Sequence, residues 1–463
     1  MKKNVGLANQ RVSFLYKQQH TMIMKQQTIE FDAETAIAHA KKLGADQIAV
    51  NVSSGKGFSV KAQNRSIETV EHYEDQAFSI TVFVKKSMGS ATTNNLSKDS
   101  LLETTEKALS LASLTAADEF NGLADSNLMA TEPIDLDLHH PWKLDMGKAQ
   151  TMALECEQAA LESDPKVDNS EGATVGTYES HSLYANSHGF VGATNTTGHT
   201  ISCTAVASEN GSMEMDYEYS AARKAEDLLD HEKIGYKAGI QACSHLGARK
   251  IKTQKAQVLY SPRQAKSLIS HITDAISGTS LYQKNSFLLD SMDQHICPDY
   301  LTITEQPHLK SSFGSTYFDG EGVKTKPRTL VEQGVLRGYL LSSYSARRLG
   351  LTTTGNAGGH HNLLIEPTLS GGLEEIIRTM ATGLVVTDLI GYGVNIVNGD
   401  YSRGANGFWV ENGAIQYPVS EITIAGNLKN ILQRILLIGN DCDKNSTIHS
   451  GSILIDDMMV AGQ

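Results

Sequence analysis

Two Asn-Gly pairs restrict how the segment from Gly383 to Asn427 can fold. The alternating run Val394 to Val397 precedes Asn398-Gly399, and Phe408 to Val410 lies ahead of Asn412-Gly413. Asn-Gly readily adopts the positive φ angles that a type I′ turn needs at both central positions, so each pair predicts a tight hairpin. The segment is therefore predicted to form an antiparallel β-meander.

A glycine-rich run, Gly399 to Gly407, lies between the two predicted turns. Glycine at this density lets a backbone approach a ligand or a neighbouring strand closely. Arg403 within the run could bind a carboxylate or peptide carbonyl groups, or form an ordinary surface ion pair. A glycine-bent sheet edge without chemistry is the alternative explanation for the whole run.

Size and composition exclude several classes of protein. A chain of 463 residues with 40% hydrophobic and 20% charged residues is typical of a soluble globular protein with two or three domains. A net charge of −12 argues against nucleic acid as the main partner. The sequence contains no run of about 18 apolar residues, so no membrane span is predicted. Five scattered cysteines without a C-x-x-C pair indicate free thiols in a reducing compartment, so a cytoplasmic location is predicted.

The alternation of helical and strand patterns predicts an α+β protein in several parts. Residues 1–25 are basic and polar without an apolar signal core, which indicates a disordered leader. The predicted domains are an N-terminal α/β unit at 26–125, a central α/β unit at 126–250 and a β-rich C-terminal domain at 251–463.

Individual elements can be predicted within these domains. Three alternating runs predict separate strands in the first unit. Helices are predicted in all three domains, and Pro262 suits the first turn of the helix in the last one. The strands are Gln47 to Val52, Phe58 to Ala62 and Ala77 to Val84, and the helices are Lys98 to Ala112, Met146 to Ser163, Ala225 to Leu246 and Pro262 to Ile276.

The residues alone assemble no catalytic site. Phosphate-binding loops, dinucleotide fingerprints and nucleophile elbows are missing from the sequence. The nearest zinc-protease fragment runs from His231 to Gly235, but glycine stands where a second histidine should be, which indicates a solvated helix start. His360-His361, after a glycine-rich loop, could bind a metal or serve as polar loop residues. The lone His271 on its predicted helix is typical of a hydrogen-bonded core or rim residue.

Long strings in the C-terminal half closely resemble the PmbA (TldE) branch of the TldD/PmbA family. They are SFLLDSMDQHICPDYLTI from Ser286, SSYSARRLGLTTTGNAGG from Ser342, GDYSRGANGFWVENGAIQYPVSEITIAGN from Gly399 and the closing GSILIDDMMVAGQ. The resemblance covers the chain from about Thr28 to Gln463. It implies an N-terminal α/β part and a β-rich, barrel-like C-terminal domain in cytosolic dimers. Members are described as metallopeptidases and as modulators of DNA gyrase.

The resemblance also implies that this chain lacks the family's zinc ligands. The TldD branch carries His-Glu-x-x-x-His on a helix and a further cysteine ligand from the glycine-rich segment. Carried onto this sequence, the first histidine is His271, while Ile272 replaces the glutamate, Ile276 the second histidine and Ala405 the cysteine. A catalytic zinc needs about three protein ligands, and one imidazole cannot hold it. Without the glutamate no base would activate water. No metal is therefore expected on this chain.

The leading hypothesis is a non-ligating subunit of a zinc peptidase that acts on unfolded or extended peptides, with the zinc on a TldD-type partner. Main-chain pairing with a sheet edge would hold such a peptide. The residues predicted to line the groove are His271, Asp400, Tyr401, Arg403 and Asn406. A homodimer is possible without the partner, and neither nucleic acid nor membrane is expected to bind.

Two other hypotheses stay open. One is a self-sufficient metallopeptidase that uses His271 with His360 or His361 as ligands. The other is a non-proteolytic interaction protein that modulates gyrase or another regulator.

Overall fold

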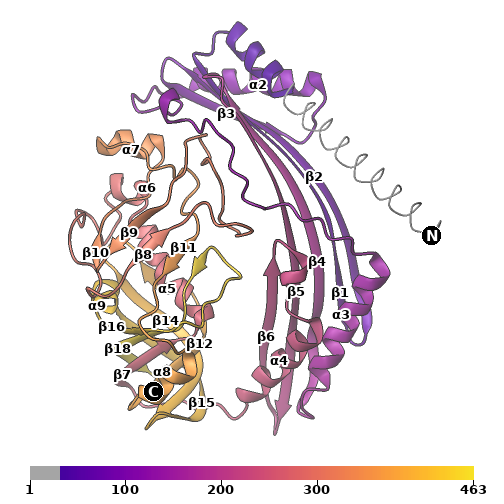
Figure 1. The fold of residues 1–463 in the computed structure, drawn as a ribbon, viewed down its shortest axis with the longest axis vertical. Helices are drawn as coiled ribbons and strands as arrows, with labels where there is room; N and C mark the ends of the chain where they lie inside the picture. The colour runs from indigo at the N-terminus through magenta and orange to yellow at the C-terminus, as the bar shows by residue number, and fades with distance from the viewer. Residues whose placement is uncertain (1–31, 463) are drawn as a thin grey trace, which may run out of the picture. The chain divides into compact units, whose positions relative to one another are not determined.

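The structure, a computed structural model, describes residues 32–462 (Figure 1). The leader predicted at 1–25 lies outside the described residues. Helices alternate with large sheets, so the predicted α+β class is confirmed. The chain forms two compact units. Within the described residues, one comprises 32–55, Glu74–Ala130 and Ser180–Asn195, and the other comprises Lys56–Tyr73, Thr131–Glu179 and 196–462. Among the described helices, none is long and apolar enough to cross a membrane.

The strands of a six-stranded sheet are divided between the residue ranges of the two units. Its order is β3-β2-β1-β4-β5-β6, and the β2–β3 and β5–β6 pairs are antiparallel hairpins. The strands are β1 Gln47–Gln63, β2 Ser66–Val84, β3 Ser87–Thr93, β4 Val167–Asn186, β5 Val191–Glu209 and β6 Ser212–Ala222.

The predicted break between Gln47–Val52 and Phe58–Ala62 is wrong, because β1 runs through both segments. The glycine at position 57 explains the difference. A Cβ on Gly57 would overlap the carbonyl oxygen of Thr177 on β4. The glycine therefore permits a close approach between strands instead of marking a turn.

Close backbone packing also sets two helix contacts. In the first unit α2 (Lys98–Leu114) lies against β3, where a Cβ on Gly89 would overlap the backbone of α2. In the second unit α3 (Met146–Leu161) packs on α4 (His231–Ser244) through Gly235 and Gly239 of α4.

The start predicted for this last helix, Ala225, is wrong. Residues Ala225–Asp227 form only a short 3-10 turn, η2. Helix α4 begins at His231 because the Asp230 carboxylate accepts the backbone N–H of Lys233 at 3.2 Å. Such a cap satisfies a donor that the first helical turn leaves free.

The C-terminal part of the second unit contains a closed five-stranded barrel, which confirms the barrel-like prediction. The parallel pair β7–β12 is followed around the ring by antiparallel β14, β15 and β18, and β18 returns to β7. These strands are β7 Gln254–Tyr260, β12 Thr382–Ile390, β14 Asp400–Glu411, β15 Ala414–Asn427 and β18 Ile453–Ala461. Two short strands extend the ring, β13 Val394–Asn395 on β14 and β16 Ile435–Ile438 on β18.

A second sheet of five short strands has the order β10-β9-β8-β11-β17. Its strands are β8 Ile303–Glu305, β9 Arg328–Glu332, β10 Val335–Leu336, β11 Leu363–Ile365 and β17 Ile448–His449. The remaining helices are η1 Ser126–Leu128, α5 Pro262–Ala275, α6 Gly278–Tyr282, α7 Ser343–Leu349, α8 Leu373–Thr379 and α9 Leu428–Gln433.

Only one of the two predicted Asn-Gly turns is a two-residue hairpin. Asn412 and Gly413 have φ of 52° and 75° and join β14 to β15 directly, as predicted. At Asn398-Gly399 only the glycine has a positive φ, 83°, and four residues separate the paired Asn395 and Asp400. The Asn398 side chain instead accepts the backbone N–H of Asp400 at 3.0 Å, an alternative turn that asparagine favours.

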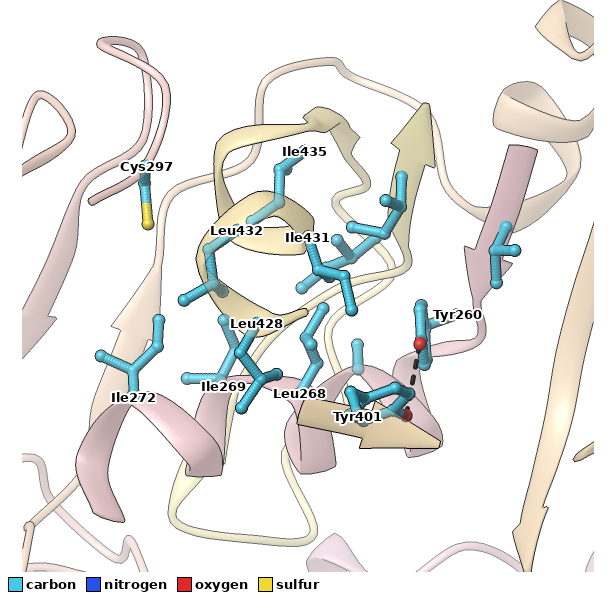
Figure 2. Packing of buried hydrophobic residues seen from close by; sticks show 14 of the residues in the cluster. Tyr260, Leu268, Ile269, Ile272, Cys297, Tyr401, Leu428, Ile431, Leu432 and Ile435 are labelled. Carbon is cyan, nitrogen blue, oxygen red and sulfur yellow. Dashed lines mark hydrogen bonds between the residues drawn. The ribbon is translucent and has the colours of Figure 1, made fainter. Parts of the chain in front are cut away.

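Helix α5 buries one apolar face beside the barrel. It follows β7 directly and packs against β7 and β12. Figure 2 shows Leu268 and Ile269 on α5 facing Leu428 and Ile431 on α9 within one apolar core. Burial of this face fixes the direction in which the polar face of α5 points.

Candidate functional site

The polar face of α5 meets one face of strand β14. Ser267 and His271 are four residues apart, so they share one side of the helix. Alternate residues of a strand also share a side. This brings Tyr401 and Arg403 of β14 to the helix, and three of the predicted groove residues, His271, Tyr401 and Arg403, therefore lie together.

Two direct contacts define this arrangement. The His271 and Tyr401 rings meet edge-on, with centroids 5.9 Å apart and an interplanar angle of 67°. The Arg403 guanidinium donates through Nη1 to the Ser267 hydroxyl at 3.1 Å and through Nη2 to the Leu389 carbonyl at 3.3 Å. The guanidinium thus joins α5, β12 and β14.

A buried tyrosine pair lies behind the site. The Tyr260 hydroxyl on β7 donates to the Tyr401 hydroxyl at 3.3 Å, as Figure 2 shows. Both side chains are almost fully buried, and burial raises the pKa of each phenol. Both phenols therefore remain protonated at neutral pH and serve as hydrogen-bonding groups rather than bases.

His271 is held in its neutral form. Burial, and next the positive charge of Arg403, lowers its pKa to about 4. At neutral pH the imidazole therefore carries no charge. Its Nε2 atom is buried and has no hydrogen-bond partner among residues 32–462, and the same is true of Arg403 Nε.

Ile272, Ile276 and Ala405 lie in the apolar core. Ile272 is 2% exposed, and the other two are fully buried in the same core. Their alkyl side chains offer no lone pair to a metal. His271 belongs to no group of three His, Cys, Asp or Glu side chains within 32–462 whose ligand atoms lie within 4.8 Å of one another. The residues around His271 therefore do not fit a zinc ion.

The other histidines singled out in the sequence make hydrogen bonds away from His271. His360 Nε2 lies 3.1 Å from the Thr447 hydroxyl, and His361 Nε2 lies 2.9 Å from the Gly355 carbonyl oxygen. His231 lies 2.9 Å from a carboxylate oxygen of Glu155, at the start of α4. The interpretation of the His231 fragment as a helix start is thus confirmed.

Asp400 and Asn406 are not brought to His271. Asp400 lies at the β13–β14 hairpin, where its carboxylate accepts the Asn398 amide at 2.8 Å. Asn406 accepts the backbone N–H of Glu421 at 3.3 Å. Asp400 alternates with Tyr401 and therefore points to the other face of β14, whereas Asn406 lies in the bulge between Ala405 and Gly407.

Sequence reasoning missed two groups of polar residues. Ser267 could have been found, because it lies four residues before His271 on a predicted helix. The second group surrounds the buried Glu305 carboxylate, which binds Arg328 at 2.7 Å, the Asn356 amide at 2.8 Å and the backbone N–H of His361 at 2.8 Å. Nothing in the local sequence signals this network, since its members come from separate segments.

Family models match most of the chain. The three domains of the PmbA/TldA metallopeptidases match in order: domain 1 at residues 49–112, the central domain at 139–246 and the C-terminal domain at 253–462. Together they account for both α/β parts and the barrel.

Relatives and solved structures agree with these matches. The chain is 43% identical over 427 residues to a metalloprotease PmbA homolog of Haemophilus influenzae, covering 92% of this chain and 94% of the relative. It is 44% identical over 435 residues to metalloprotease PmbA of Escherichia coli O157:H7, covering 93% and 96%.

The fold is similar to that of a crystal structure from Bacteroides thetaiotaomicron described as a candidate modulator of DNA gyrase. The TM-score is 0.88 at 28% identity, with 94% and 99% of the two chains covered. TldE from Thermococcus kodakarensis shares the fold, with a TM-score of 0.79 at 21% identity and 93% and 100% coverage. With 43–44% identity to PmbA proteins over most of its length, this chain belongs to the PmbA/TldD metallopeptidase family.

Proposed function

We propose that this chain is the PmbA/TldE-type subunit of a two-subunit peptidase whose zinc is held by a TldD-type partner in the cytoplasm. The observation that carries the proposal is the set of side chains at the motif positions near His271. Three positions that would supply the general base and two further ligands are buried alkyl groups, at Ile272, Ile276 and Ala405.

Electrostatics support the same conclusion. The charge that contributes to the lowered pKa of His271 is that of the Arg403 guanidinium, which already disfavours a proton on the imidazole. A divalent cation at His271 would meet the same repulsion with twice the charge. A neutral imidazole with a pKa of about 4 is also a poor general base at neutral pH.

The contribution of this chain to proteolysis would then be substrate binding and completion of the dimer. The partly exposed His271 and Arg403 would offer hydrogen-bonding groups to an extended peptide, while the Tyr401 side chain is buried beneath them. Strand β14, which pairs with the short β13, carries most of the glycine-rich run. Main-chain pairing would hold unfolded or extended peptides with little preference for their side chains.

The test is to purify the chain alone and together with its TldD-type partner, and to measure bound zinc and cleavage of an unstructured peptide in both samples. We expect no cleavage by the lone chain and chelator-sensitive cleavage by the complex. In the complex, His271→Ala should leave the zinc content unchanged. Chelator-sensitive cleavage by the lone chain would refute the proposal.

A self-sufficient metallopeptidase would need His271 together with His360 or His361. The hydrogen bonds of His360 to Thr447 and of His361 to Gly355 argue against that ligand set. Measuring the metal content of His271→Ala and His361→Ala variants decides the question. Unchanged metal content in both variants dismisses these ligands.

A non-proteolytic role as a modulator of gyrase is a second candidate. It is favoured by the description of the Bacteroides thetaiotaomicron structure. Co-purification from cells separates the two candidates: recovery of gyrase without a TldD-type partner would favour the interaction protein, and recovery of a TldD-type subunit favours the peptidase.

A further inference from the structure

Three metal-binding side chains meet where helices α3 and α4 pack. Glu155 belongs to α3, and His231 and Glu232 begin the first turn of α4. Nε2 of His231 lies 2.9 Å from a carboxylate oxygen of Glu155. One ligand atom from each of the three residues lies within 4.8 Å of the other two. His231 is partly exposed and both glutamates are exposed, so an ion from solution can reach all three side chains.

The packing of the two helices holds these groups in place. Glu155 directly precedes Cys156, whose carbonyl oxygen a Cβ on Gly235 would overlap, so the two helix backbones come very close beside the cluster. Gly235 follows His231 by one helical turn. The start of α4 is fixed by the Asp230 cap. The three ligand atoms therefore belong to two packed helices rather than to a loop, and such elements position ligands more accurately.

An ordinary ion pair does not account for the whole cluster. Even when it is protonated, the imidazole of His231 carries one positive charge against the two negative charges of the glutamates. Within residues 32–462, neither Glu155 nor Glu232 forms an ion pair with a lysine or an arginine. Two carboxylates at this separation repel each other unless a positive charge lies between them. A divalent cation would neutralise both carboxylates and would also accept the lone pair of the imidazole.

The set of donors suits a transition metal. Zinc binds imidazole nitrogen and carboxylate oxygen at about 2.0–2.2 Å, so two donors in neighbouring positions around the ion lie about 3.0–3.4 Å apart. The 2.9 Å between His231 and Glu155 is close to that range, and a rotation of the exposed Glu232 side chain would bring the third donor to the ion. Magnesium and calcium prefer oxygen ligands, whereas imidazole is a typical ligand of zinc and its neighbours.

The N-terminal end of α4 opposes a cation, because the free N–H groups of a first turn give a helix a partial positive charge. That partial charge is about half an elementary charge, whereas Glu155 and Glu232 contribute two full negative charges. The Asp230 carboxylate, which accepts the backbone N–H of Lys233, adds negative charge at the same helix end. The local balance of charge therefore favours a divalent cation.

We infer that Glu155, His231 and Glu232 form a binding site for a divalent transition-metal cation such as zinc. A cation held there links α3 to α4, so it should stabilise the folded chain when it binds. None of the three residues is a motif position near His271. The inference therefore goes beyond the proposed function and does not depend on it.

Calorimetric titration of the metal-free, full-length chain with zinc at neutral pH tests the inference. We expect one zinc ion per chain whose binding is at least about tenfold weaker in His231→Ala, since even the outer hydrogen-bond partners of metal ligands contribute about 10–100-fold. Glu155→Gln and Glu232→Gln should each weaken the same site, because the amide that replaces the carboxylate is uncharged. Magnesium should bind less tightly than zinc, because it gains little from the imidazole.

His39→Ala is the matched control. Nε2 of His39 lies 3.2 Å from a carboxylate oxygen of Glu106, but this pair belongs to no group of three such side chains within residues 32–462. The control should bind zinc as the parent chain does. Thermal unfolding provides an independent measurement: excess zinc should raise the melting temperature of the parent chain and of His39→Ala by a few degrees, but not that of His231→Ala.

Three results would overturn the inference. They are a parent chain that binds no zinc, a His231→Ala variant that keeps the affinity of the parent chain, and magnesium binding as tight as zinc binding, which would mean that the imidazole is not a ligand. If His231→Ala does not fold, unchanged zinc affinity in both Glu155→Gln and Glu232→Gln overturns it instead. The measurements use the lone chain without a peptide, so the proposed function can stand or fall separately.

Discussion

The imidazole of His271 on α5 packs edge-on against the phenol ring of Tyr401 on β14, with ring centroids 5.9 Å apart. This contact joins helix α5, which carries His271, to the strand that carries Arg403. In this chain the histidine therefore faces an aromatic ring and a guanidinium. Separate substitutions can test the contributions of His271, of Arg403 and of the pair Tyr260 and Tyr401.

The tyrosine pair should be energetically coupled. Tyr401→Phe removes the acceptor of the Tyr260 hydroxyl, which is buried and whose second partner is the Met458 sulfur at 3.7 Å. We expect a loss of about 1–2 kcal/mol in the free energy of unfolding for either single Phe variant. The double variant should lose less than the sum of the two, and urea unfolding of all four proteins measures the difference. Additive losses would mean that the hydroxyls do not interact.

His271 should make stability depend on pH in the acidic range. Its pKa is lowered to about 4 in the folded chain, against about 6.5 when unfolded. Its contribution is thus fully present above pH ~6.5 and is lost as the pH falls towards 4, because the unfolded chain takes up the proton first. The loss amounts to about 2–3 kcal/mol and should be missing in His271→Gln. Urea unfolding between pH 7 and pH 4 measures it, and equal slopes for both proteins would contradict the prediction.

Removal of the Arg403 charge should change the pKa of His271. In Arg403→Gln the repulsion between guanidinium and imidazolium is gone, so the pKa of His271 should rise. It should stay below its ordinary value, since burial is the larger cause of the shift. The pKa is read from the imidazole resonances in an NMR titration, with Arg378→Gln as a control that should leave it unchanged. A fall in the pKa of His271 in Arg403→Gln would disprove the electrostatic account.

Glu305 should be essential for the loop that carries His361. It is 1% exposed and binds Arg328, Asn356 and the backbone N–H of His361. Glu305→Gln leaves the partly buried arginine without its counter-charge, and we expect a loss of about 3 kcal/mol. Glu332→Gln is the matched control, because Glu332 pairs with Arg337 in an exposed position and should cost less than about 1 kcal/mol. Similar losses in the two variants, measured by thermal or urea unfolding, would exclude this role.

Restoring one histidine of the family motif should damage the fold rather than create a metal site. Ile276 is fully buried in the apolar core, so Ile276→His places an unpaired polar ring there at a cost of about 3 kcal/mol. Ile276→Val keeps the core apolar and should cost about 1 kcal/mol. Unfolding experiments compare the two, and metal analysis of Ile276→His should find no added zinc. A stable Ile276→His variant with one bound zinc would show that the pocket tolerates a ligand set.

Local sequence patterns predicted those features that neighbouring residues decide. Asn412-Gly413 forms its tight turn because the two residues adopt positive φ without help from distant parts. Pro262 begins α5, and apolar periodicity identifies the buried face of that helix. The inability of Ile272 and Ile276 to bind a metal through their side chains is likewise a property of the sequence, since an alkyl group has no lone pair in any fold.

The errors in the sequence interpretation have a common cause. Gly57 resembles a turn residue in the sequence, but its role depends on the Thr177 carbonyl more than one hundred residues away in the chain. Asn398-Gly399 resembles the other Asn-Gly pair, yet the pairing of Asn395 with Asp400 places it in a four-residue connection. In both places tertiary packing overrides the local preference of glycine and asparagine.

The sequence by itself determined the class of the fold, the position of the helix that carries His271 and the alkyl side chains at Ile272 and Ile276, because these depend on residue identity and on periodicity over a few residues. Only the tertiary structure decided that the barrel closes and that Arg403 reaches Ser267 on α5, 136 positions earlier in the chain. It also decided that, among the residues that the structure describes, this guanidinium forms no ion pair with a carboxylate. Such relationships depend on how distant segments pack, and short-range backbone preferences carry no information about them.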